Sequence, residues 1–282
     1  MRRNAIYARR LIGDIGPLNT DPASNLPGKI IAPAVSMTGV RQEYDEASTT
    51  QRYKIGSRMV VDERVFHYAK AGATLDCGLG AFNTYTQHVS FALVAIASSG
   101  ATSLVVTVGG GDGVAGNGDI AEDELFGGYI VIWPADMTET MNRRVVGNTA
   151  TTGGGTMTVT LDRPLSAALV GTDHAEIMAC QYLNVQTASP AYGFHTVVGM
   201  PPVSATINQY LWLQTWGPVW ITALAGAGDG NHNRRVYFRE NGSVMKNDAG
   251  ATYANSQLAG YILANAPGGG QGAPFIQLML AP

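Results

Sequence analysis

A glycine-rich stretch between residues 109 and 123 carries the residue types best suited to hold a metal ion. Asp112, Asn117 and Asp119 offer carboxylate and amide oxygens, the ligands that Ca²⁺ prefers. The motif occurs once, whereas the β-helix turns of this composition bind calcium as stacked copies. We therefore predict a surface loop, with calcium at these three residues as the weaker alternative, and no other metal or cofactor.

The residues that usually perform catalysis are scattered along the chain. The five histidines form no pair at the spacing of two or four residues that a metal site favours: His67, His88, His174, His195 and His232. No Gly-x-Ser-x-Gly nucleophile elbow occurs, and no Gly-Lys-Ser/Thr follows the glycine-rich stretch to make a phosphate loop. We predict a protein that is not an enzyme. The remaining alternative is a hydrolase, for which Asp173 beside His174 is one candidate pair.

Positive charge is concentrated near the beginning of the chain. Residues 1–76 contain 11 Lys/Arg and 8 Asp/Glu, a net charge of +3, whereas residues 77–282 contain 7 and 13, a net charge of −6. Four arginines, Arg2, Arg3, Arg9 and Arg10, lie within the first ten residues. A basic segment on an acidic body suits docking onto an acidic surface, and a solvated terminus is the alternative.

Three tryptophans recur at a spacing of four: Trp212, Trp216 and Trp220. The surrounding Thr, Val, Ile, Gly and Pro favour a strand over a helix. Large aromatic side chains in a strand fill a core or anchor an interface with another subunit. Both roles remain open for these three residues.

Short β-like runs bounded by glycine are the elements expected to position the candidate metal, catalytic and aromatic residues. Examples are residues 104–108, 128–133 and 157–161. A hairpin is predicted across Asp62-Glu63-Arg64, and a closing hairpin joins residues 260–264 to residues 275–280. The run from Gln209 to Thr215 reads as a strand that Trp216-Gly217-Pro218 interrupts.

The predicted organisation is an extended arm followed by two β domains. Prolines at positions 17, 22, 27 and 33 exclude regular structure from much of the first 50 residues. We predict an N-terminal arm over residues 1–50, a middle β domain over 51–188 and a C-terminal β domain over 189–282. The fold class is mainly β, with small sandwich or barrel-like domains and little helix.

Composition also bears on the core, on nucleic-acid binding and on membrane insertion. Hydrophobic residues make up 45% of the 282 residues, enough for a substantial core. The net charge of −3 provides no general attraction to nucleic acid. No stretch of about 18 apolar residues occurs and no apolar segment follows the first arginines, so we predict neither a membrane span nor a signal peptide.

Several stretches resemble virion proteins of tailed bacteriophages. They are Tyr44–Gln51, Ile55–Arg58, Arg64–Gly72 and Tyr210–Pro218, and the closing runs at residues 260–263 and 275–280 are similar to the last hairpin of small capsid-decoration domains. His67 stands where the family pattern has arginine. The resemblance covers about residues 44–72 and 189–282.

The resemblance implies a capsid decoration, or head cement, protein. Such a protein would be made in the host cytoplasm, bind the major capsid protein on the exterior of the virion, and stabilise the head as a homotrimer. The candidate capsid-docking residues are then Arg2, Arg3, Arg9, Arg10 and Arg41. The alternative is a tail-tube, baseplate or fibre protein of the virion that binds a host surface.

Overall fold

The computed structural model describes residues 39–83, 87–133, 139–187, 196–222, 227, 234–246, 256–264 and 274–282. These residues form strands and no helix, which confirms the mainly β fold class. No helix among them is long and apolar enough to span a membrane. Residues 1–38, most of the predicted arm, lie outside the described residues.

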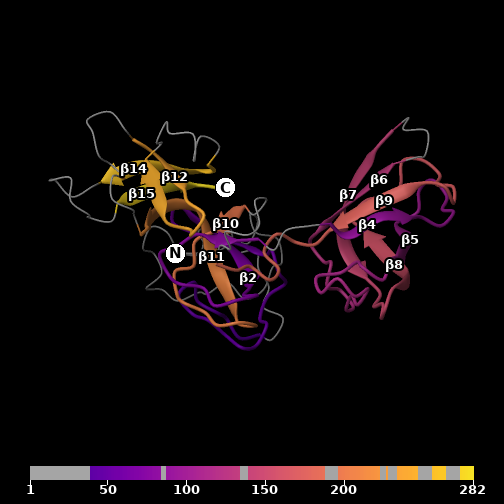
Figure 1. Ribbon diagram of the computed structural model, residues 1–282, viewed down its shortest axis with the longest axis horizontal. Helices are drawn as coiled ribbons and strands as arrows, with labels where there is room; N and C mark the ends of the chain where they lie inside the picture. The colour runs from indigo at the N-terminus through magenta and orange to yellow at the C-terminus, as the bar shows by residue number, and fades with distance from the viewer. Residues whose placement is uncertain are drawn as a thin grey trace, which may run out of the picture. The chain divides into compact units, whose positions relative to one another are not determined.

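The chain divides into two compact units (Figure 1). The host unit comprises Met1–Thr84 and Tyr182–Pro282, and the inserted unit comprises Tyr85–Gln181. The predicted boundaries after residues 50 and 188 do not coincide with these units, because strands from before and after the insertion pair within the host unit. Phe82 and Gln186, which flank the insertion, form an antiparallel bridge, so the chain leaves and re-enters the host unit at one place.

Nine strands of the host unit are described. Seven form one sheet in the order β1-β2-β11-β15-β14-β12-β13, and β10 pairs with β3. Their bounds are β1 Arg58–Val61, β2 Arg64–Lys70, β3 Ala81–Phe82, β10 Val197–Gly199, β11 Tyr210–Trp220, β12 Arg235–Phe238, β13 Val244–Lys246, β14 Leu258–Ala264 and β15 Phe275–Met279. The two predicted hairpins are confirmed as β1–β2 and β14–β15.

The long strand β11 holds the host sheet together, because it pairs with β2 along its first half and with β15 along its second. The interruption predicted at Trp216-Gly217-Pro218 is wrong, since β11 runs through it. A register shift between Gln214 and Trp216 bends the strand there. Gly217 has φ +97°, and a Cβ at this position would lie 2.7 Å from the Glu63 carbonyl oxygen.

The inserted unit is a six-stranded antiparallel sheet in the order β4-β9-β6-β7-β8-β5. The strands are β4 Gln87–Leu93, β5 Ser103–Val108, β6 Tyr129–Trp133, β7 Met141–Asn148, β8 Gly155–Leu161 and β9 His174–Met178. The segment that continues β4 returns to β5, where Val94 bridges Val106 and the Ala95 N–H donates to the Val105 carbonyl at 2.8 Å. The sheet therefore curls into a barrel-like shape, with its interior filled by alternate residues of its strands.

Alternation explains which side chains enter the core of the inserted unit. In β6, Ile130 and Ile132 are fully buried, while Tyr129 points outward. In β8, Met157 and Val159 are buried in the same way. The same period-2 pattern, already visible in the sequence, gives this unit a hydrophobic core of its own.

Candidate interaction surfaces

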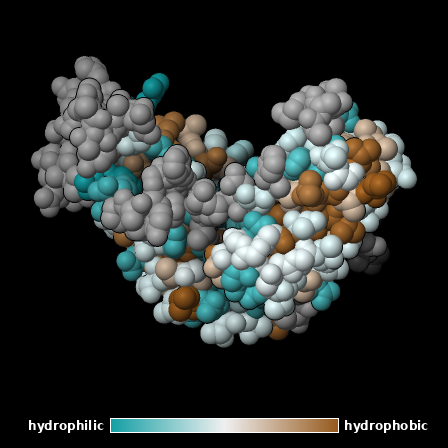
Figure 2. Space-filling model, turned by 45° about the vertical axis from the view of Figure 1, so that its right-hand side comes forward, coloured by the Kyte–Doolittle hydropathy of each residue, from teal (hydrophilic) through white to brown (hydrophobic). Residues whose placement is uncertain are grey.

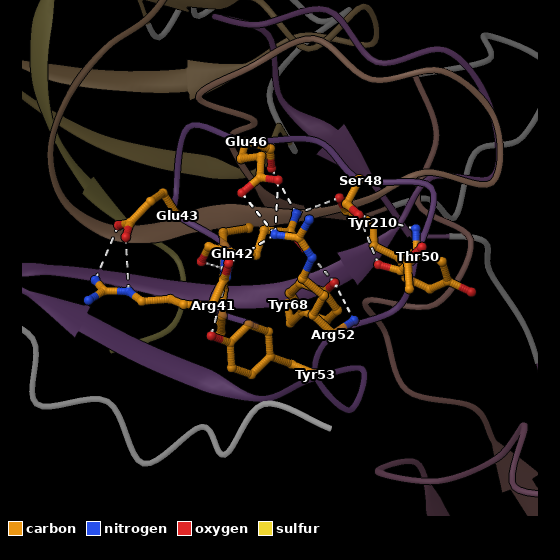
Figure 3. Close-up of polar contacts among 11 residues, drawn as sticks. Arg41, Gln42, Glu43, Glu46, Ser48, Thr50, Arg52, Tyr53, Tyr68 and Tyr210 are labelled. Carbon is orange, nitrogen blue, oxygen red and sulfur yellow. Dashed lines mark hydrogen bonds and ion pairs between the residues drawn. The ribbon is translucent and has the colours of Figure 1, made fainter. Parts of the chain in front are cut away.

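The segment that follows residue 38 is anchored to the host unit by a buried glutamine (Figure 3). Gln42 is fully buried, and its amide nitrogen donates to the carbonyl oxygens of Glu46 and Tyr210, each at 2.8 Å. Its amide oxygen accepts from the Tyr68 hydroxyl at 2.6 Å. The Trp212 indole N–H donates to the Gln42 carbonyl at 3.0 Å. Residues beyond position 40 thus belong to the folded host unit and not to an arm.

Aromatic rings surround this anchor. Tyr53, Tyr68 and Trp212 pack edge to face or tilted, with ring centroids 4.9–5.2 Å apart. Burial raises the pKa of Tyr68 to about 12, so its hydroxyl stays protonated and can donate to Gln42. Tyr44–Gln51, Arg64–Gly72 and Tyr210–Pro218 meet here, because Ser48 bridges Tyr210 and β2 pairs with β11.

Arg41 lies on the surface next to the buried Gln42. Its guanidinium pairs with Glu43 at 3.1 Å, and both side chains are substantially exposed. Arg52 connects two parts of the chain near Gln42. It pairs with Glu46 at 3.0 Å and donates to the Arg41 carbonyl. Arg2, Arg3, Arg9 and Arg10 lie outside the described residues, so they remain predictions as docking residues.

The three tryptophans lie in different environments. Trp212 is fully buried in the core of the host unit. Trp216 is partly buried, and Trp220 remains 53% exposed near the end of β11. A Cβ on Gly78 would lie 2.7 Å from the Trp220 ring, so the ring covers a position that only glycine fills without adjustment. Their different environments within one strand leave an interface role open for Trp216 and Trp220, and not for Trp212.

The outer side of β11, β15 and β14 forms an exposed apolar surface. Its strand register places Trp220 opposite Phe275 and Trp216 opposite Met279. Tyr261 lies opposite Gln277, the residue between Phe275 and Met279 on the same side. The opposite side of these strands contributes Ile262, Ile276 and Leu278 to the core. We call the surface formed by Trp216, Trp220, Tyr261, Phe275 and Met279 the host face.

The inserted unit has a comparable surface of its own. Tyr129 lies opposite Met178, and the two are 53% and 55% exposed. Trp133 stacks on His174 of β9, and Leu93 of β4 lies opposite the same histidine. Figure 2 shows hydrophobic residues gathered on the side of the inserted unit turned toward the viewer. We call the following residues the insert face: Leu93, Tyr129, Val131, Trp133 and Met178.

The two units carry opposite net charges. The inserted unit contains 3 Lys/Arg and 10 Asp/Glu, a net charge of −7, whereas the host unit contains 15 and 11, a net charge of +4. Five of the host unit's basic residues and two of its acidic residues lie in residues 1–38. The division found in the sequence at residue 76 is thus a division between an acidic insertion and a basic host.

The predicted calcium residues hold the glycine-rich loop together. Asp112 accepts from the N–H groups of Gly109 and Ser90, at 2.7 and 3.2 Å. Asp119 accepts from the N–H of Gly153 at 2.7 Å, and from the Asn117 amide. Within the described part of the chain, no three His, Cys, Asp or Glu side chains converge in a way that would hold a metal ion. Calcium at this loop remains a prediction.

His67 has a strongly displaced pKa. Burial, together with the charge of Arg58, lowers the pKa of His67 to about 4. Its ring stacks on Tyr182 with centroids 4.6 Å apart, and Nδ1 lies 3.1 Å from the Thr215 hydroxyl oxygen. That hydroxyl lies 2.6 Å from the Ala281 carbonyl, to which it donates, so it can accept from His67 Nδ1–H. His67 is therefore neutral and structural.

Sequence reasoning did not identify the host and insert faces or the Gln42 anchor. The alternation of β14 and β15 was visible, but it does not show which side of a strand lacks a partner. Comparison of the chain with protein-family models, with curated proteins and with solved structures gave no match.

Proposed function

We propose that this chain is a non-enzymatic structural protein of a tailed-phage virion that decorates the outside of the head by binding the major capsid protein. The observation that supports docking is the Gln42 anchor. It fixes the root of a 38-residue segment with four arginines to the aromatic core of the host unit. A basic segment held at one end can reach over a neighbouring subunit and form charge-assisted hydrogen bonds there.

The location of the phage-like stretches supports the same proposal. Tyr44–Gln51 and β2 lie near one another in the sequence, whereas β11 follows about 140 residues after β2, and the three contact one another around Gln42, Tyr68 and Trp212. Residues that resemble a family's pattern and also form one packed core suggest a shared fold. Capsid binding would then depend on the surface around that core and on the segment rooted in it.

Binding to purified heads that lack this protein tests the proposal. The full chain should co-sediment with heads and saturate. A chain beginning at Gly39 keeps the Gln42 anchor, and it should fold normally but bind heads at least tenfold more weakly. Replacing Arg2, Arg3, Arg9 and Arg10 by Glu should have a similar effect. Arg163→Gln, which removes a highly exposed arginine of the inserted unit, is the matched control.

Two results would count against the proposal. Equal binding by the chain that begins at Gly39 would remove the docking role of residues 1–38. Failure of the full chain to bind heads would rule out the proposed decoration function. Saturable binding of the full chain to host cell envelopes would then favour the tail or fibre alternative.

A further inference from the structure

The host face and the insert face each expose apolar side chains of their sheets, with Trp220, Tyr261 and Phe275 on the host face and Leu93, Tyr129 and Met178 on the insert face. Three half-exposed aromatic rings, Trp220, Tyr261 and Phe275, present about 300 Å² on the host face. Met279 and the partly exposed Trp216 extend this area. The largest apolar patch on a typical monomer measures about 300–600 Å² and is often functional. A standard interface buries about 800 Å² per partner, of which somewhat more than half is apolar.

The composition of each face fits a protein partner. Half-exposed aromatic and methionine side chains are the types enriched at interfaces. Two such sheet faces can pack about 10 Å apart, as in a β-sandwich. The faces therefore have suitable shape and chemistry to cover one another.

Charge distinguishes between possible partners. The inserted unit has a net charge of −7 and the host unit one of +4, of which residues 1–38 contribute +3, so like units of two copies repel and unlike units attract. Beside the host face, Arg235 lies opposite Tyr261. On the insert face, Glu176 lies opposite Val131, and Arg144 lies opposite Tyr129 at the border.

We propose that the insert face of one copy packs against the host face of a second copy, in a head-to-tail contact that builds the homo-oligomer. Such a contact uses two different patches on each subunit, which is the requirement for a closed ring such as a trimer. The inference does not depend on what the assembled protein coats, and it can be tested without heads.

A complementation experiment with the full chain tests this contact. The first variant, Tyr261→Glu with Phe275→Glu, disrupts the host face, and the second, Tyr129→Lys with Met178→Lys, disrupts the insert face. Light scattering after size exclusion should give wild type a mass of two or more copies of 29.7 kDa. Each variant alone should have the mass of one copy. An equal mixture should form a species of two copies, because one intact host face meets one intact insert face.

Controls separate this effect from misfolding. Ile207→Asp in the host unit and Val170→Asp in the inserted unit replace exposed apolar residues that belong to neither face, and both should assemble like wild type. Thermal unfolding of each variant checks its fold. If the charged variants unfold, Phe275→Thr and Met178→Thr, which keep strand propensity, replace them. Raising the salt concentration should weaken the wild-type assembly, because the attraction between units is screened.

Three results would overturn the proposal. The first is wild type with the mass of a single copy. The second is an insert-face variant that still assembles while the host-face variant does not, which would indicate a symmetric contact between two host faces. The third is two monomeric, folded variants that stay monomeric when mixed.

Discussion

Gln42 shows how one buried polar residue can connect distant parts of the host unit. Both of its amide protons and its amide oxygen are paired, so its burial leaves no unmet hydrogen-bonding group on the side chain. A satisfied network in a low-dielectric interior is rigid, and removing one member leaves the others unpaired at a cost of about 1–3 kcal/mol each. The chain around Gln42 is therefore held by hydrogen bonds of defined geometry as well as by the aromatic rings that surround it.

The lowered pKa of His67 predicts that the free energy of unfolding falls in acid. Its folded pKa of about 4 lies below the ordinary value of 6.5, so the unfolded chain binds this proton more readily. The contribution of neutral His67 is complete above pH 6.5 and is lost as the pH falls toward 4. His67→Gln should reduce the fall in the free energy of unfolding between pH 7 and pH 4.5 by about 2 kcal/mol.

Urea unfolding at a series of pH values measures this effect. Tyr182→Phe keeps the ring that stacks on His67 and should retain the wild-type pH dependence. An unchanged pH dependence in His67→Gln would show that the histidine does not control acid stability.

At the scale of elements, Gly217 allows β11 to pass the β1–β2 turn. Gly217→Ala would combine a positive φ with a Cβ 2.7 Å from the Glu63 carbonyl and 2.9 Å from the Arg64 Cα. We expect the free energy of unfolding of the host unit to fall by about 2–4 kcal/mol. Denaturant titration followed by tryptophan fluorescence reports on it, since three of the four tryptophans lie in the host unit.

The matched control for Gly217→Ala is Gly171→Ala. No neighbouring atom lies within 4 Å of the Cβ that Gly171 would acquire, so the change should cost less than about 1 kcal/mol. Similar stabilities for the two variants would mean that the bend at Gly217 is not constrained.

Local patterns in the sequence predicted elements whose cause is also local. The β1–β2 and β14–β15 hairpins were found because turn residues separate runs with strand propensity. The interruption of β11 was mispredicted because Gly and Pro usually end strands, whereas here they accompany a register shift. The different burial of Trp212 and Trp220 depends on which segments cover β11, which no local pattern specifies.

At the scale of the whole molecule, the sequence could not locate the insertion. The host unit is completed by pairing β2 with β11, about 140 residues later in the chain. Composition changes little where the chain leaves the host unit near Phe82 and returns near Gln186. The charge difference between units was detectable, but a single division at residue 76 obscured it because the basic host lies on both sides of the acidic insertion.

The host unit should fold without its insertion. Replacing residues 85–181 by a short Gly/Ser linker keeps both residues of the Phe82–Gln186 bridge and removes a net charge of −7. We expect a folded β protein with a net charge of +4 that binds a cation exchanger at pH 7 and unfolds in one cooperative transition. The full chain is the control, and calorimetry should show an additional transition from the inserted unit. An aggregated or unfolded product would show that the host unit requires its insertion.

The pairing of β2 with β11 also sets the order in which the nascent chain can fold. At about 5–20 residues per second, a ribosome needs roughly 7–28 seconds to pass from β2 to β11. During that interval Phe66 and Tyr68 have no β11 to cover them, and every strand of the inserted unit is synthesised before β11. The insertion can therefore fold before its host unit is complete, and β2 exposes its aromatic side chains until β11 has been synthesised.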